Sequence, residues 1–156
     1  MKMGTYFIDF EGFLNNDGDI IIKELCIMDA NNILNPFHNV YRMEFPPNPI
    51  NSIIQSKNLF LITHHHHLRW FEGNSLQNIY DQYSPNSIYY TLDTEDGNKI
   101  KTLQIYFPKM RIANYAKTIF NLPIISPNIS CIWHDHGPNC EYKSCLAMAI
   151  DYCKSY

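Results

Sequence analysis

The chain lacks an excess of basic residues. Its 12 Lys and Arg are outnumbered by 15 Asp and Glu, which gives a formal net charge of −3. Without a global positive field, any contact with nucleic acid must come from a local patch. The chain also lacks an apolar stretch of about 18 residues and an apolar leader after its first residues. We therefore expect a protein without membrane contact that resides inside the cell, in the cytoplasm or the nucleus.

The cysteines do not form an even set. The chain has five, which are Cys26, Cys131, Cys140, Cys145 and Cys153. Small secreted domains usually carry an even disulfide framework, so this odd set favours reduced thiols, some of them on a metal. Cys145 and Cys153 stand beside apolar residues in a helical pattern, and we expect both to belong to the core.

The composition predicts one domain that spans residues 1–156. Apolar residues make up 46% of the chain, which is enough for one substantial core. Periodicity and turn signals predict strands at 5–14, 20–29, 36–45, 87–92 and 110–114, and helices within 46–61 and at 75–84, 93–107 and 140–154. Strands and helices in this order are typical of an α/β fold of the RNase H-like class, a mixed sheet with helices on both faces.

A cluster of metal-binding residue types precedes the last predicted helix, in the stretch CIWHDHGPNC. Cys131 and His134 are three positions apart and can occupy two corners of a zinc tetrahedron. Cys140 is the natural third ligand, because the start of a helix favours the thiolate form. His136 and Cys145 are reserve ligands. These residues alone leave a chance arrangement as an equal alternative.

Two regions, KELCIMDANNILNPFHNVYRMEFPP and CIWHDHGPNCEYKSCLAMAIDYCK, resemble the signature regions of the Maelstrom domain, an RNase H-like domain of a germline small-RNA pathway protein. The likeness covers about a third of the chain. It implies a closed zinc site in which a strand glutamate joins the cluster, with Glu24, Cys131, His134 and Cys140 as ligands. The interval between His134 and Cys140 is shorter than in the family, which leaves Cys145 as an alternative ligand.

The chain also resembles short insect, insect-virus or transposon-derived proteins. The shared features are Asp9-Phe-Glu11-Gly12, Lys23-Glu24-Leu25, Phe45-Pro46-Pro47 and His67-Leu68-Arg69-Trp70.

The zinc site that the Maelstrom resemblance implies is expected to be structural, because a zinc ion with four protein ligands has no open position. It would join segments more than a hundred residues apart and contribute directly to folding. The alternative is that Glu24 is an ordinary polar residue of an edge strand.

The first strand also resembles the first motif of the DEDD exonucleases. Alternation along a strand places Asp9 and Glu11 on one face, as shared binding of two Mg²⁺ ions requires. The mechanism needs further carboxylates after the middle strand and near the last helix. Candidates for the middle position are Asp93, Glu95 and Asp96, whereas Asp135 and Asp151 fit the last position poorly. The pair could equally face solvent.

The run of four histidines, 64–67, leads into Leu-Arg-Trp-Phe. Consecutive residues cannot all face one ion, so the run alone does not predict a metal site. His67, Arg69 and Trp70 could bind single-stranded RNA, because aromatic rings stack on unpaired bases and a cation contacts phosphate. The equal alternative is a surface loop whose Trp70 fills the core.

The leading hypothesis is a zinc-stabilised RNase H-like domain that binds single-stranded RNA. Should it also cleave RNA, the available base and electrophile are His136, His67 and Arg69. The first alternative is a magnesium-dependent 3′ to 5′ exonuclease that uses Asp9 and Glu11. The second is a non-catalytic interaction module of viral or transposon origin. Whether the chain is an enzyme is left open by the sequence.

Overall fold

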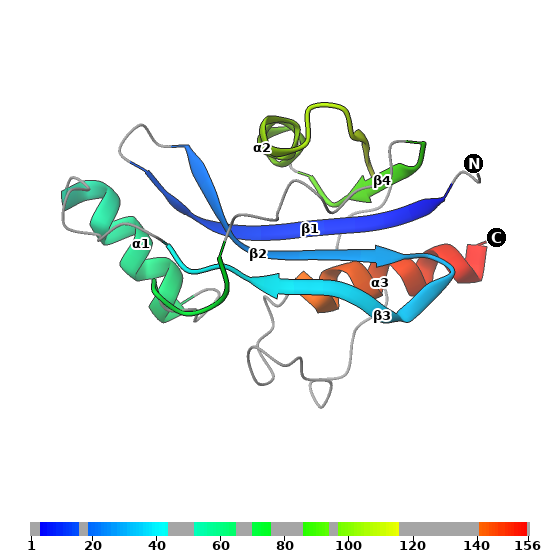
Figure 1. Cartoon of the computed structure of the whole chain (residues 1–156), viewed down its shortest axis with the longest axis horizontal. Helices are drawn as coiled ribbons and strands as arrows, with labels where there is room; N and C mark the ends of the chain where they lie inside the picture. Colours follow the sequence, from blue (N-terminus) through cyan, green and yellow to red (C-terminus); the bar gives the residue numbers. More distant parts are fainter. Residues whose placement is uncertain are drawn as a thin grey trace.

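The computed structural model describes residues 4–15, 19–43, 52–64, 70–75, 86–93, 97–115 and 141–155. Its elements are β1 (Thr5–Leu14), β2 (Ile20–Asp29), β3 (Asn32–Val40), α1 (Ser52–His64), β4 (Ile88–Thr91), α2 (Asn98–Tyr106), β5 (Arg111–Asn114) and α3 (Glu141–Ser155). The succession of strands and helices in the described part agrees with the one that the sequence predicts (Figure 1).

The strands form a five-stranded mixed sheet in the order β3-β2-β1-β4-β5. The first three strands are antiparallel neighbours, whereas β4 lies parallel to β1 and β5 parallel to β4. A tight turn joins β2 to β3, where the Asp29 carboxylate accepts a hydrogen bond from the amide of Asn31. The fold is therefore a mixed α/β fold, consistent with the RNase H-like class.

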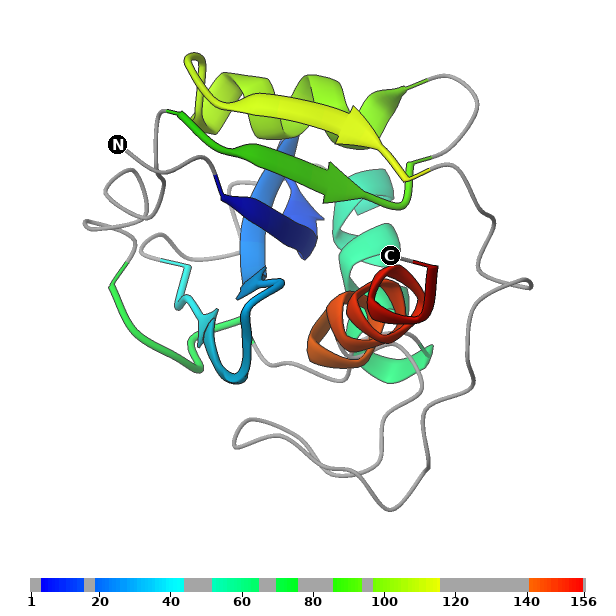
Figure 2. The same cartoon turned by 90° about the vertical axis from the view of Figure 1, so that its right-hand side faces the viewer.

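The two faces of the sheet carry separate apolar clusters. Side chains alternate along β1, so Phe7 and Ile8 point to opposite faces. Ile8 packs with Leu103 of α2, and Phe7 packs with Met148 of α3. Figure 1 accordingly shows α2 above β1 and α3 below it, and Figure 2 views the same layers with α3 nearly end-on. The prediction of helices on both faces is confirmed.

A third cluster lies at the end of β1 beside α1. It consists of Phe13, Met43, Ile54 and Trp70. The side-chain amide of Asn58 in α1 accepts a hydrogen bond from the backbone N–H of Leu14 (2.8 Å) and donates one to its carbonyl (3.0 Å). Asn58 thus satisfies both backbone hydrogen-bonding groups of Leu14, the last residue of β1. None of the helices in the described ranges is long and apolar enough to cross a membrane.

Several element boundaries differ from the sequence prediction. β3 begins at Asn32 and not at residue 36, because its pairing with β2 continues back to the Asp29–Asn32 turn, and it ends at Val40, before the predicted end at residue 45. α1 begins at Ser52, after the proline-rich stretch. α2 begins at Asn98 and not at residue 93, because Gly97 has a left-handed backbone (φ 71°) that starts the helix there. The helix predicted at 75–84 lies almost wholly outside the described residues.

Candidate functional site: two polar clusters on the α3 face

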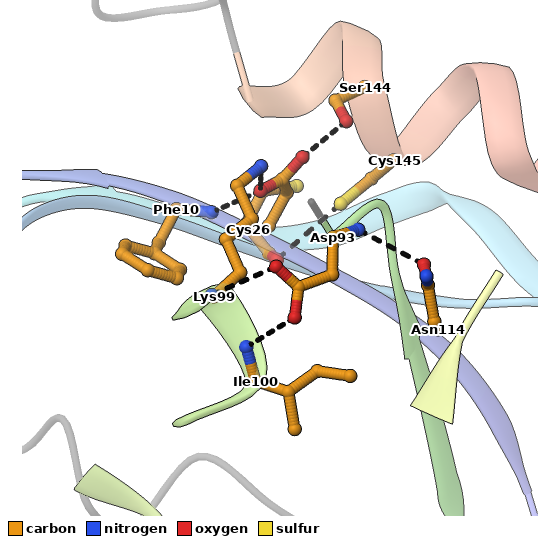
Figure 3. Close-up of polar contacts among 9 residues, drawn as sticks. Phe10, Cys26, Asp93, Lys99, Ile100, Asn114, Ser144 and Cys145 are labelled. Carbon is orange, nitrogen blue, oxygen red and sulfur yellow. Dashed lines mark hydrogen bonds and ion pairs between the residues drawn. The ribbon is translucent and has the colours of Figure 1, made fainter. Parts of the chain in front are cut away.

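Asp9 lies in the middle of β1 and is only 2% exposed. Its Oδ1 accepts hydrogen bonds from the amide of Phe10 (2.9 Å) and the ammonium of Lys99 (2.5 Å). Its Oδ2 accepts one from the hydroxyl of Ser144 (2.5 Å). We call Asp9, Lys99 and Ser144 the Asp9 cluster. It joins β1, α2 and α3 (Figure 3), which are far apart in the sequence.

The topology explains why these elements meet at Asp9. β4 pairs with β1 only between Thr5 and Phe7 and ends at Thr91. Asp9 therefore lies just past the carboxyl end of a parallel strand, the place where α/β sheets usually build their sites. The Lys99 side chain is 28% exposed, so the cluster has one side toward solvent.

Asp93 follows the end of β4 and holds the start of α2. Its Oδ1 accepts a hydrogen bond from the amide of Lys99 (2.9 Å), and its Oδ2 accepts one from the amide of Ile100 (3.0 Å). Its own amide donates to the side chain of Asn114 at 3.0 Å (Figure 3). This carboxylate satisfies two of the amides that the first turn of a helix leaves unpaired. Asp93 thereby fixes the backbone of Lys99.

Asp9 and Glu11 lie on one face of β1, as predicted. Asp9 is paired with Cys26, and Glu11 with Glu24, in a regular stretch of the antiparallel register. The later carboxylates of the predicted magnesium centre are otherwise engaged. Asp93 caps α2, and Asp151 accepts a hydrogen bond from the hydroxyl of Tyr115. Glu95, Asp96 and Asp135 lie outside the described residues.

Glu24 lies on β2 and is fully buried. The imidazole Nε2 of His38 lies 2.6 Å from Glu24 Oε2, and both side chains are almost completely buried. His38 is paired with Cys26, and Val40 with Glu24, so His38 is the diagonal neighbour of Glu24 on the same face. We call these two residues the Glu24–His38 pair. Sequence reasoning missed His38; the available signal was the need of a buried carboxylate for a donor on a neighbouring strand.

The start of α3 is directed toward Glu24. Ser144 contacts Asp9, Cys145 Sγ lies 3.5 Å from the carbonyl oxygen of Cys26, and the rings of Tyr152 and Phe7 are 5.6 Å apart. α3 therefore runs antiparallel to β1.

The step from Ser144 back to Glu141 is about one helical turn, roughly 5 Å. The step from Asp9 to Glu11 along the strand is about 7 Å. The backbone at the first residue of α3 therefore lies beyond Ser144 in the direction of Glu11 and Glu24. Cys140 immediately precedes that residue in the sequence.

The other three predicted zinc ligands, Cys131, His134 and Cys140, lie outside the described residues. Within the described ranges no three His, Cys, Asp or Glu side chains are grouped so that they could hold a metal ion. Glu24 is thus the one predicted zinc ligand that the structure places.

The two cysteines of α3 differ in their surroundings. Cys145 is fully buried among apolar residues and its thiol faces the carbonyl of Cys26. This position is that of a core residue, as expected. Cys153, also expected in the core, is exposed. The last turn of α3 extends past the edge of its apolar cluster, which ends at Tyr152.

Trp70 belongs to the core and is not available for stacking on bases. It is 7% exposed, and the centroids of its indole and of the Phe13 ring are 4.8 Å apart. The interpretation of Trp70 as an RNA-stacking residue is therefore corrected in favour of its packing role. The next residue, Phe71, is 62% exposed. His67 and Arg69, predicted to contact RNA with Trp70, lie outside the described residues.

Lys23, part of the Lys23-Glu24-Leu25 motif, is a buried cation to which the sequence assigned no role. It is fully buried on β2, and its ammonium donates hydrogen bonds to the carbonyls of Trp70 (3.2 Å) and Glu72. Burial lowers the pKa of Lys23 to about 8, although the charge of Glu72 acts in the opposite direction. Lys23 ties the segment around Trp70 to the sheet.

The chain matches no protein-family model, and no curated protein sequence is significantly similar to it. Function is therefore inferred from the fold, the Asp9 cluster and the Glu24–His38 pair.

Proposed function

We propose that the chain is a zinc-stabilised RNase H-like domain that binds single-stranded RNA. The observation that carries this proposal is the full burial of Glu24 in the middle of the sheet, with its carboxylate held by His38. A buried carboxylate is costly unless it is paired or bound to a metal. The cysteine and histidine motif that could complete such a site lies immediately before α3 in the sequence.

The residues present fit zinc. Carboxylate, thiolate and imidazole are its usual ligands, and Cys131, His134 and Cys140 would complete the set with Glu24. Carboxylate ligands of metals are commonly held in place by a further hydrogen bond, which His38 would supply. Such a site would stabilise the fold by linking β2 to the segment before α3.

The RNA part of the proposal rests on the resemblance to the Maelstrom domain, with whose fold class the order of the strands is consistent. The segment around Trp70 is the best candidate for the contact. Trp70 anchors this segment in the core, and Phe71 presents an exposed ring beside it. An exposed aromatic ring is suited to stacking on unpaired bases, and Arg69 stands two positions before Phe71 in the sequence.

The Asp9 cluster disfavours the magnesium-dependent exonuclease. Both carboxylate oxygens of Asp9 already accept hydrogen bonds, one of them from an ammonium group. A Mg²⁺ ion at Asp9 would have to compete with the charge of Lys99.

Elemental analysis tests the zinc site. The protein should be purified without an affinity tag, because the histidine run could itself retain metal. We expect about one zinc per wild-type chain and a large loss of zinc in Glu24→Gln. Glu11→Gln is the matched control, since Glu11 is the cross-strand neighbour of Glu24 and the chemical change is the same. Zinc-free wild-type protein, or equal zinc loss in both variants, would contradict the site.

Binding of labelled single-stranded RNA tests the RNA part. We expect binding that weakens as salt rises, with a weaker affinity in Phe71→Ala. Leu34→Ala is the control, because Leu34 is 86% exposed and lies on β3. No RNA binding at low salt would refute this part and would favour the interaction module. Trimming from RNA ends that requires magnesium would favour the exonuclease.

A further inference from the structure

We infer that the outer side of the unit formed by α2 and β5 binds the phosphate backbone of single-stranded RNA. The cations that would make this contact are Lys101, Lys109 and Arg111, which we call the basic surface. The inference rests on the RNA part of the proposed function and adds to it a contact separate from Phe71. It does not depend on zinc.

The unit is basic in a chain that has an excess of acidic residues. Residues 97–115, which include α2 and β5, contain four Lys or Arg and no Asp or Glu, whereas the whole chain has a net charge of −3. One of the four, Lys99, is paired with Asp9, and the preceding Asp93 holds the first amides of α2. The three residues of the basic surface are exposed. A contact between this chain and nucleic acid requires a local patch of this kind.

The packing of α2 turns one side of the helix outward. Leu103 and Phe107 are buried in the apolar cluster between α2 and the sheet. Lys101 is exposed, and Ile105, four residues further along the same face of the helix, is 74% exposed. Figure 2 shows α2 and β5 together along one border of the molecule. The outward side of α2 is therefore open to a large partner.

The turn between α2 and β5 holds Lys109 and Arg111 in place. The side-chain amide of Gln104 donates hydrogen bonds to the carbonyls of Phe107 (3.0 Å) and Met110 (3.0 Å). The amide of Met110 donates to the carbonyl of Phe107 (3.0 Å), and the Met110 side chain is buried. The backbone that carries both cations is thus fixed before any partner binds, so that binding need only order their side chains.

The spacing of the cations fits an extended anion. α2 has nine residues and is therefore about 13 Å long. Lys101 lies on this helix, whereas Lys109 and Arg111 follow its end. Charges spread over such a length do not converge on one small anion, but they can follow the repeated phosphates of a nucleic-acid strand. Arg111 can in addition contact a phosphate through two N–H groups.

The composition of this surface favours RNA over an acidic protein. The centres of protein interfaces are apolar and depleted in lysine. The basic surface has two lysines, and Ile105 is the one large apolar side chain of residues 97–115 that is exposed. The contact with Phe71 lies elsewhere, because the segment around Trp70 pairs with the residues after β3, and β3 and β5 are opposite edges of the sheet.

The salt dependence of binding tests the inference, with labelled single-stranded oligouridine as the probe. Each phosphate contact adds about 0.7 to the slope of the logarithm of the binding constant against the logarithm of the salt concentration. The double variant Lys101→Gln with Lys109→Gln should therefore lower this slope by about 1.4, and adding Arg111→Gln should lower it by about 2 in total. Affinity at low salt should fall at least about tenfold in the triple variant.

The matched control is the double variant Lys57→Gln with Lys154→Gln. It makes the same chemical change and the same change in net charge at two exposed lysines of α1 and α3. Its slope should equal that of the wild type. All the substituted side chains are exposed, so we expect every variant to fold, which circular dichroism checks. Phe71→Ala should weaken binding and leave the slope unchanged, because stacking on bases releases no counterions.

Equal slopes in the two double-lysine variants would overturn the inference and leave RNA binding itself intact. A wild-type protein that binds no RNA at low salt would refute the RNA part of the proposed function and this inference with it. Polyglutamate is the second probe. Polyglutamate binding that is lost in Lys101→Gln with Lys109→Gln, without RNA binding by the wild type, would assign the basic surface to an acidic protein and overturn the inference.

Discussion

Removal of the Lys99 charge should destabilise the fold through Asp9. In Lys99→Met the Asp9 carboxylate stays buried but loses its ion pair with Lys99. Breaking a buried ion pair on one side typically costs 3–5 kcal/mol. The amide of Phe10 and the hydroxyl of Ser144 still donate to Asp9, and Lys99 is partly exposed. We therefore expect a loss at or below the lower end of that range, about 2–3 kcal/mol.

A double-mutant cycle distinguishes this cause from lost packing. Asp9→Asn alone should cost about 1–2 kcal/mol, because the ammonium that it leaves is partly solvated. The double variant Asp9→Asn with Lys99→Met should cost less than the two single losses together, with a coupling of about 2 kcal/mol. Urea unfolding at neutral pH, followed by circular dichroism, measures all four proteins.

The control for this cycle is Lys101→Met, which should change stability by less than about 0.5 kcal/mol because Lys101 is exposed. Simple additivity of the Asp9 and Lys99 substitutions would refute the reasoning. So would a Lys99→Met protein as stable as the Lys101→Met protein.

Three further predictions concern residues outside the Asp9 cluster. Trp70→Ala should lose about 3–5 kcal/mol of stability by emptying the cluster around Phe13, while Phe71→Ala should lose less than about 0.5 kcal/mol; equal losses in urea unfolding would contradict the core position of Trp70. Gly73 has φ +113° and an added Cβ would lie 2.3 Å from a backbone oxygen, so Gly73→Ala should cost about 2–3 kcal/mol, and an unchanged melting temperature would count against this backbone geometry. Since the pKa of Lys23 is lowered from 10.5 to about 8, the unfolded chain binds more protons between these values, and stability should rise with pH across this window. Comparison with Lys23→Met isolates this rise, and a parallel pH profile for both proteins would show that Lys23 does not cause it.

Local patterns predicted the elements well. Alternation along β1 and β2, the turn residues after Asp29 and the apolar spacing of α3 are short-range signals, and the structure has strands or a helix at each. Boundaries failed where a distant or special residue decides them. α2 starts late because Gly97 begins it and Asp93 caps it, whereas the sequence pattern from residue 93 onward looks continuous.

The candidate site was predicted less completely. Asp9, Glu11 and Glu24 were singled out as carboxylates inside strands, and the register puts Asp9 and Glu11 on one face. Their partners were not found, because His38 reaches Glu24 through the β2–β3 register and Lys99 reaches Asp9 from a helix 90 residues away. The sequence left two interpretations of Trp70, stacking on RNA bases or packing in the core, and its packing against Phe13 favours the second.

The sequence by itself determined the order of strands and helices and the shared face of Asp9 and Glu11, because periodicity and turn chemistry act over a few residues. The tertiary structure decided what those carboxylates meet. Ser144 and Asp9 are 135 residues apart, and nothing local relates them. Their contact arises because α3 must bury its apolar side against β1 and β2, and the direction in which it packs brings its first turns over the acidic end of that face.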